Sequence, residues 1–152
     1  MTEMMKKALV VDLDGTLCNN NHRLRHLFNF DESKKEKFDF NLAYSGIPKD
    51  DINTWCLELM NLYHQTGYSI IIMTGRHNWD KVKINTSIWL DKFKVPYDEL
   101  YFRQDNELVN SEMKRIYYEQ YIKDRYSIVL AIDDEIKVVE MWRSLGIPCL
   151  QC

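Results

Sequence analysis

Short, continuous apolar runs alternate along the chain with longer segments in which apolar residues recur every three or four positions. The short runs are rich in valine and isoleucine, a pattern typical of strands buried on both faces of a sheet. We expect such strands at residues 8–11, 69–73, 100–103 and 127–132, and a fifth around Leu150. The periodic segments predict four helices: one after a cap at Asp50 or Asp51 and ending before Gly67, one at 79–92, one after a cap at 110 or 111, and one at 135–145. The first of these helices would bury the apolar positions Ile52, Trp55, Leu59, Leu62 and Tyr63.

This alternation of strands and helices predicts a doubly wound, Rossmann-like α/β fold with a parallel sheet covered on both faces. Residues 18–48 show no clean period and mix both signs of charge with aromatic residues. We interpret them as a small insert over the end of the first strand, with room for one helix and too short for a large cap domain. A length of 152 residues fits one domain, 1–152.

The first strand runs directly into Asp12 and Asp14, with Gly15 and Thr16 behind them. Residues two apart on a strand point the same way, so the two carboxylates can converge. Like charges held together at a buried strand end are costly, and a divalent cation with a preference for carboxylate oxygens, such as Mg²⁺, relieves that cost. Taken alone, an Asp-x-Asp-Gly sequence is also an ordinary turn.

Two further strand ends carry polar chemistry, and this convergence separates a site from an ordinary turn. The second strand ends at Thr74-Gly75-Arg76 and the fourth at Asp133-Asp134. Ligands of such sheets bind beyond the carboxyl ends of the strands, where all three groups would meet. Each group has a plainer interpretation: Thr74 could cap a turn, Arg76 could pair with a structural carboxylate, and the acidic pair could cap the last helix.

Composition and charge limit the function more weakly. The formal net charge of −3 argues against a broadly basic nucleic-acid surface, though not against a local patch. No apolar run approaches the roughly 20 residues of a membrane span, and residues 1–7 have no stretch typical of a signal peptide. We therefore expect a cytoplasmic protein with no membrane contact and no obligate protein partner. The four cysteines are scattered and are expected to be free thiols.

In this order, the motifs resemble the haloacid dehalogenase superfamily of aspartate-nucleophile phosphotransferases. The matching elements are Asp12-x-Asp14-Gly-Thr-Leu, Thr74-Gly75, Lys114 and Asp133-Asp134. The chain resembles more closely the 3′-phosphatase domain of phage-type polynucleotide kinase–phosphatases. That likeness rests on three features: Thr-Gly-Arg at 74–76, the run of residues 131–143, and Arg23, eleven residues past Asp12, where that family keeps a substrate-contacting arginine.

Two positions depart from the family pattern. Asn110 stands four residues before Lys114, where the family commonly has aspartate, and Glu135 follows the acidic pair, where arginine is frequent. The first change removes a negative charge near Lys114, and the second makes the rim of the site less basic. The chain contains no Gly-x-x-x-x-Gly-Lys-Ser/Thr phosphate-binding loop, so we expect phosphatase chemistry without a kinase half.

Residue chemistry and the resemblance together suggest a mechanism. Asp12 would attack phosphorus to form an aspartyl-phosphate, and Asp14 would act as general acid and then base, if its surroundings hold it partly protonated. The expected Mg²⁺ ligands are Asp12, the backbone carbonyl of Asp14, Asp133 and Asp134. Thr74 and Lys114 (with Lys123 as a weaker candidate) would stabilise the transferring phosphoryl group. The residues expected to bind the rest of the substrate are Thr16, Arg23, Gly75 and Arg76.

The substrate stays open between two phosphorylated species. Arg23 and Arg76 at the mouth of an open site suit a polynucleotide 3′ end, because guanidinium groups match phosphates. A mononucleotide is the runner-up, followed by other small phosphate esters. Two rivals from other classes are a phospho-acceptor receiver domain and a nucleic-acid-binding protein without catalysis. Receivers carry their acidic pair on the first strand and the acceptor later, the reverse of the order here.

Overall fold

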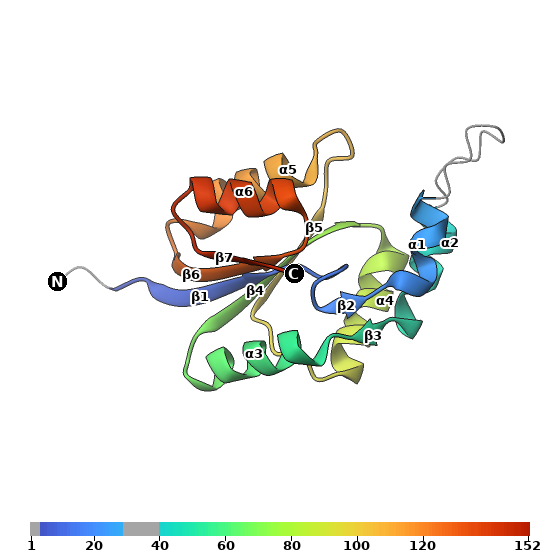
Figure 1. Cartoon of the computed structure of the whole chain (residues 1–152), viewed down its shortest axis with the longest axis horizontal. Helices are drawn as coiled ribbons and strands as arrows, with labels where there is room; N and C mark the ends of the chain where they lie inside the picture. The colour runs from blue at the N-terminus through green and yellow to red at the C-terminus, as the bar shows by residue number, and fades with distance from the viewer. Residues whose placement is uncertain (1–3, 29–39) are drawn as a thin grey trace.

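The computed structural model describes residues 4–28 and 40–152, except for the side chains of 25–28. Five parallel strands form the central sheet in the order β5-β4-β1-β6-β7 (Figure 1). Their bounds are β1 Lys6–Val11, β4 Ser69–His77, β5 Glu99–Arg103, β6 Tyr126–Asp133 and β7 Cys149–Gln151. The chain winds one way from β1 through β4 to β5 and the other way through β6 to β7, so the switch point lies between β1 and β6, where doubly wound folds bind ligands.

Helices cover both faces of the sheet. Their bounds are α3 Thr54–Gln65, α4 Asp80–Lys92, α5 Asn110–Tyr117, continued by the π-helical turn η2 Tyr118–Ile122, and α6 Ile136–Ser144. Strand β1 shows how the layers form, because Leu9 and Val11 face the core under α3 and α4, whereas Ala8 and Val10 face α5 and α6. The predicted doubly wound α/β fold is confirmed. Within the described residues, no helix combines the length and the apolar character needed to cross a bilayer.

Strand β4 is longer than the sequence predicts. The expected strand ends at Met73, but β4 continues through Thr74, Gly75 and Arg76 to His77. The register with β5 shifts after Met73, and pairing resumes between His77 and Arg103. This extension fixes the backbone of Arg76 within the sheet instead of leaving it on a loop.

The expectations for the first helix need two corrections. Neither aspartate caps α3, which begins at Thr54 after Asn53. Asp50 is instead buried in a charged network described below. Trp55 and Leu62, predicted to face the core, are 44% and 62% exposed, because the buried face of α3 is narrow and centres on Cys56 and Met60.

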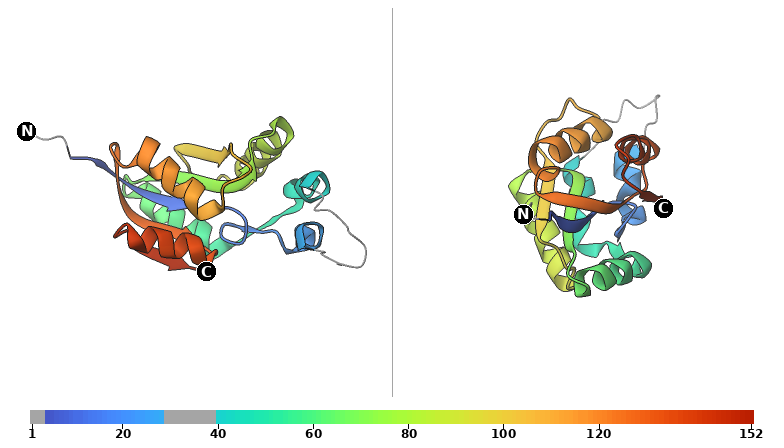
Figure 2. Two further views of the ribbon diagram at one scale, coloured as in Figure 1. Left: turned by 90° about the horizontal axis from the view of Figure 1, so that it is seen from above. Right: turned by 90° about the vertical axis from the view of Figure 1, so that its left-hand side faces the viewer.

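The insert after β1 lies beyond the carboxyl ends of the strands, next to α4 (Figure 2). It contains more structure than the one helix expected: α1 Asn21–Phe28, α2 Phe40–Ser45 and the 3₁₀ turn η1 Ile47–Lys49. A short antiparallel pair, β2 Cys18–Asn19 and β3 Asp51–Ile52, closes its base. Residues 29–39 of the predicted insert lie outside the described residues.

Candidate active site

A cavity of about 630 Å³ opens at the carboxyl ends of β1, β4 and β6, bounded on one side by the insert. It is lined by most of the site residues predicted from the sequence: Asp12, Asp14, Arg23, Gly75, Arg76, Lys114, Asp133 and Asp134. Thr16 and Thr74, also predicted, do not line it. Three strand ends and one helix therefore bring their polar groups to one place, as parallel topology requires.

Lys114 is the centre of the acidic half of the cavity. Its Nζ donates to Asp12 Oδ1 at 2.9 Å and to Asp133 Oδ2 at 2.6 Å. Carboxylate oxygens of Asp12, Asp133 and Asp134 all lie within 4.8 Å of one another. Lys114 is 2% exposed and lies on α5, so the helix delivers one buried cation to three converging anions. The weaker candidate Lys123 lies at the surface, paired with Glu119 at 2.6 Å.

The charges of this half of the cavity shift the pKa values of its members. Burial and the neighbouring Asp133 raise the pKa of Asp12 well above its usual value, although Lys114 opposes them. Burial and Asp133 also raise the pKa of Asp134. Burial alone would lower the pKa of Lys114, but Asp12 and Asp133 outweigh it and raise that pKa. The three carboxylates repel one another, and one lysine offsets only one of them. The excess of acidic groups favours the binding of a cation.

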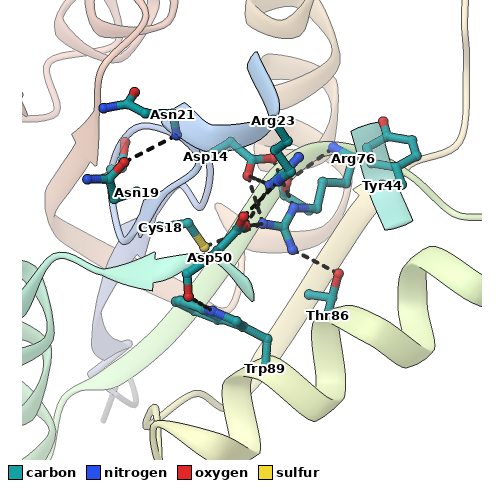
Figure 3. Close-up of polar contacts among 12 residues, drawn as sticks. Asp14, Cys18, Asn19, Asn21, Arg23, Tyr44, Asp50, Arg76, Thr86 and Trp89 are labelled. Carbon is teal, nitrogen blue, oxygen red and sulfur yellow. Dashed lines mark hydrogen bonds and ion pairs between the residues drawn. The ribbon is translucent and has the colours of Figure 1, made fainter. Parts of the chain in front are cut away.

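Asp14 belongs to a second network in the cavity, with two arginines. Arg76 donates to Asp14 through Nε at 2.9 Å and Nη2 at 2.7 Å, and Arg23 Nη2 donates to the same carboxylate (Figure 3). Both arginines also pair with Asp50, at 2.7 Å from Arg23 Nη2 and 3.2 Å from Arg76 Nη2. The carboxylates of Asp12 and Asp14 therefore share one cavity but not one set of partners.

This network corrects the expected position of the arginines. Arg23 and Arg76 were predicted at the mouth of the pocket, but each is only 1% exposed, on the wall of the cavity. Arg76 also donates to Thr86 at 3.0 Å. Among the described residues, Nη1 of Arg23 is a buried guanidinium nitrogen without a hydrogen-bond partner. Buried side chains therefore hold both arginines in place, and Nη1 of Arg23 keeps unused hydrogen-bond donor capacity.

The pKa of Asp14 moves in the opposite direction from that expected for a general acid. Burial would raise it, but Arg76 and Arg23 outweigh burial and lower it to about 2. The sequence-based mechanism requires surroundings that hold this carboxyl partly protonated. The insert does contribute to those surroundings, but through Arg23, which favours the ionised form.

Asp50 is the central residue that the sequence analysis missed. It accepts hydrogen bonds from both arginines and from His22 Nε2 at 2.8 Å, and its side chain is fully buried. Its backbone carbonyl accepts from Trp89 of α4 at 2.8 Å. Asp50 follows Pro48 and Lys49 and precedes a helical pattern, which suggests a helix cap. No local signal in the sequence shows that it instead pairs with arginines 26 and 27 residues away.

Thr16 contacts two acidic residues of the site, whereas Thr74 makes a local contact. Thr16 Oγ1 lies 3.2 Å from Asp12 Oδ2 and 3.3 Å from Asp134 Oδ1, so its hydroxyl connects two of the acidic residues. Thr74 Oγ1 accepts a hydrogen bond from the backbone N–H of Arg76 at 3.1 Å. That bond matches the plainer interpretation of Thr74 as a residue that stabilises the local backbone.

The two residues that depart from the family pattern contact each other. Asn110 Nδ2 donates to Glu135 Oε2 at 2.7 Å, and Asn110 Oδ1 accepts from Arg103 Nη2. Asn110 also lies over Gly75, where an added Cβ would come within 2.7 Å of Asn110 Oδ1. Both changes therefore belong to one arrangement on the cavity wall, which ties α5 to the start of α6.

Gly15→Ala is expected to disrupt this site more than a comparable change elsewhere. Gly15 has φ +81°, and an added Cβ would lie 2.3 Å from Asp134 Oδ2, so Asp134 or the loop must move. Gly67→Ala is the matched control, since Gly67 has φ +90° and open space around it. Both variants incur about 1–2 kcal/mol of backbone strain. Denaturant unfolding should show the greater loss for Gly15→Ala, and equal losses would contradict the clash.

The comparison with protein families settles the classification. Residues 6–152 match the family model of the polynucleotide kinase PNKP phosphatase domain. The chain belongs to this family. As a PNKP-type phosphatase domain, it is a phosphoric monoester hydrolase of the haloacid dehalogenase type. The predicted resemblance is confirmed.

Individual relatives agree with this family. The structures of a Pnkp1/Rnl/Hen1 complex and of a Pnkp1/Rnl/Hen1 RNA repair complex each contain a chain 28% identical to this one, with TM-scores of 0.77 and 0.78 over 97% of its residues. A protein of Autographa californica nuclear polyhedrosis virus, provisionally named as a bifunctional polynucleotide kinase/RNA ligase, is 25% identical over 144 residues, 93% of this chain. A haloacid dehalogenase-like hydrolase of Streptococcus pneumoniae shares the fold, at 15% identity and a TM-score of 0.65, covering 99% of this chain and 85% of that one.

The PNKP-type relatives are longer than this chain. It corresponds to 46% and 42% of the two chains in the Pnkp1/Rnl/Hen1 complexes and to 18% of the viral protein. What those proteins do as a whole is therefore a property of more than this domain.

Proposed function

We propose that the chain hydrolyses phosphate monoesters through an aspartyl-phosphate at Asp12, and that its substrate is the 3′-phosphate of a polynucleotide end. The observation that carries this proposal is the position of the Asp12 carboxylate. It lies at the end of β1 in an open cavity, bonded to the buried Lys114, with Asp133 beside it. Phosphoryl transfer asks mainly for position and for neutralisation of charge, and the site offers both.

In the first step, an Asp12 oxygen forms a bond to phosphorus while the bond from phosphorus to the 3′ oxygen breaks. Asp14 gives its proton to that departing oxygen. In the second step, Asp14 takes a proton from water, whose oxygen displaces the Asp12 carboxylate from phosphorus. A bound dianionic phosphate repels the ionised form of Asp14 and competes for its two arginines. Both effects raise the pKa of Asp14 and so favour the protonated form that the first step needs.

Magnesium is the cofactor that we propose for this reaction. Asp12, Asp133 and Asp134 present three carboxylates within 4.8 Å of one another, and hard oxygen donors of this kind suit Mg²⁺. The backbone carbonyl of Asp14 completes the proposed ligand set, because its carboxylate is committed to the arginines. When bound, the ion supplies positive charge that offsets repulsion between the phosphate and the nucleophile.

Metal binding can be measured without turnover. Mg²⁺ is expected to raise the melting temperature of the wild-type protein, because a ligand that binds only the folded state adds about 2.7 kcal/mol of stability at 100 times its Kd. Asp133→Asn should reduce this rise, whereas the exposed Asp80→Asn on α4 should leave it unchanged. A rise of equal size in Asp133→Asn would place the metal elsewhere.

A polynucleotide end is favoured over other esters by the arginines and by the relatives. Arg23 has one buried donor to spare, and guanidinium is suited to phosphate oxygens. One relative at 28% identity comes from a complex named for RNA repair. In the proposed role, this domain prepares a 3′ end by removing its phosphate.

The substrate proposal is tested by phosphate release from a matched set of compounds. One oligonucleotide carrying a 3′-phosphate is compared with the same oligonucleotide carrying a 5′-phosphate, and with 3′- and 5′-mononucleotides. We expect the highest kcat/KM for the 3′-phosphorylated oligonucleotide. A higher value for mononucleotides would instead assign the chain to nucleotide hydrolysis, with the same mechanism.

A further inference from the structure

Four aromatic rings form a cluster where the insert meets the end of β4. Phe40 and Tyr44 come from successive turns of α2, His77 ends β4, and Trp79 immediately precedes α4. His77 stacks on Trp79 with ring centroids 4.6 Å apart and planes at 20°. Phe40 lies edge-on to His77 at 4.9 Å and to Trp79 at 6.4 Å. The cluster therefore joins the insert to the sheet through ring contacts.

The inner half of this cluster is held rigidly. Tyr44 and His77 are 7% and 8% exposed, and the Tyr44 hydroxyl and His77 Nδ1 share a hydrogen bond of 2.6 Å. The Tyr44 hydroxyl also accepts from the His77 backbone N–H at 3.3 Å. The outer rings, Phe40 and Trp79, are 36% and 40% exposed. Two partly exposed rings are thus supported from behind by two fixed ones.

The cluster is continuous with the candidate active site. Phe40 and Tyr44 line the same cavity as Asp12, Lys114 and Arg76. Figure 3 shows Tyr44 beside Arg76. The cavity therefore has a charged region that suits a phosphate and, on the insert side, an aromatic wall that no step of the phosphoryl transfer uses.

We propose that Phe40, which lines the cavity, forms a stacking platform for the nucleobase attached to the sugar whose phosphate is removed, with Trp79 at its border, where the two ring planes cross at 87°. This inference rests on the proposed function, and it adds a binding element for the rest of the substrate. An exposed aromatic face beside a phosphate site suits a flat, uncharged ring, and stacking of a base on aromatic side chains tolerates any base. The platform thus predicts recognition of a nucleotide without preference for its sequence.

The first test compares a substrate with and without the base. For the wild type, kcat/KM is expected to be about 10- to 100-fold higher for a nucleoside 3′-monophosphate than for ribose 3-phosphate, the range that stacking of one base provides. Phe40→Ala, with Phe40→Leu as a milder variant, should bring this ratio close to one, mainly through KM, and Trp79→Ala should lower it. Trp55→Ala is the control, because Trp55 is about as exposed as Trp79 but lies on α3, outside the aromatic cluster.

The second test is binding without turnover, observed by tryptophan fluorescence in the presence of EDTA. A nucleoside 3′-monophosphate should quench the fluorescence of the wild type and of Trp55→Phe, but much less that of Trp79→Phe, and ribose 3-phosphate should quench none of them. Equal kcat/KM with and without the base in an active wild type, or quenching that survives in Trp79→Phe, would overturn the platform alone. Absence of phosphate release from every compound would overturn the proposed function, and the quenching result would still decide whether the base stacks.

Discussion

Asp12→Asn is expected to lower phosphate release by on the order of 10⁴-fold or more, the range found when a member of a covalent catalytic set is removed. The variant is expected to be at least as stable as the wild type. Activity is lost because an amide cannot form the aspartyl-phosphate. Stability is kept because burial and Asp133 raise the pKa of Asp12, so that its ionised form is costly in the folded state. Lys114 retains its 2.6 Å contact with Asp133.

The measurement pairs phosphate release with denaturant unfolding in EDTA. Asp80→Asn is the matched control, because its carboxylate is exposed on α4, and it should change neither quantity appreciably. Turnover that survives Asp12→Asn would remove Asp12 from the role of nucleophile. A large loss of stability would show instead that Asp12 is chiefly a structural partner of Lys114.

Asp50→Ala is expected to cost about 3–5 kcal/mol of unfolding free energy, the range for breaking a buried ion pair by removing one partner. Arg23 and Arg76 would stay buried with only Asp14, itself partly exposed, to balance two positive charges. The hydrogen bonds from His22 and from both arginines would be lost with the carboxylate.

The neighbouring Asp51→Ala provides the control for this loss, because Asp51 is exposed. Urea unfolding should show a much lower midpoint for Asp50→Ala than for Asp51→Ala, with similar m-values. Equal midpoints would mean that the arginines find other partners, and that the insert does not depend on this network.

The sequence predicts the fold well because burial leaves a strong pattern. Strand β1 is buried on both faces from Ala8 to Val11, β6 is buried from Ala131 to Asp133, and both contain unbroken apolar runs that lead to Asp12 and Asp133. Lys114 was identified by resemblance, and the structure explains its place through the two carboxylates that it bonds. The fold is therefore predicted where it needs only local patterns and parallel topology.

The remaining features depend on distant partners. Asp50 resembles a helix cap until Arg23 and Arg76 are placed around it, and burial of those arginines becomes favourable only when their acidic partners are present. The same network lowers the pKa of Asp14, which a pattern of residues along the chain does not reveal. The exposure of Trp55 has a similar origin, since helical spacing predicts a face but not how wide the covering layer is.

The most direct test of the central claim is to find the phosphoryl group on the protein. The wild type is mixed with an oligonucleotide carrying a radiolabelled 3′-phosphate and Mg²⁺, quenched in acid within one turnover, and digested into peptides. The account predicts a hydroxylamine-sensitive label on the peptide that contains Asp12, and none in Asp12→Asn. A label on another residue, or undiminished phosphate release from the same oligonucleotide by Asp12→Asn, would contradict it.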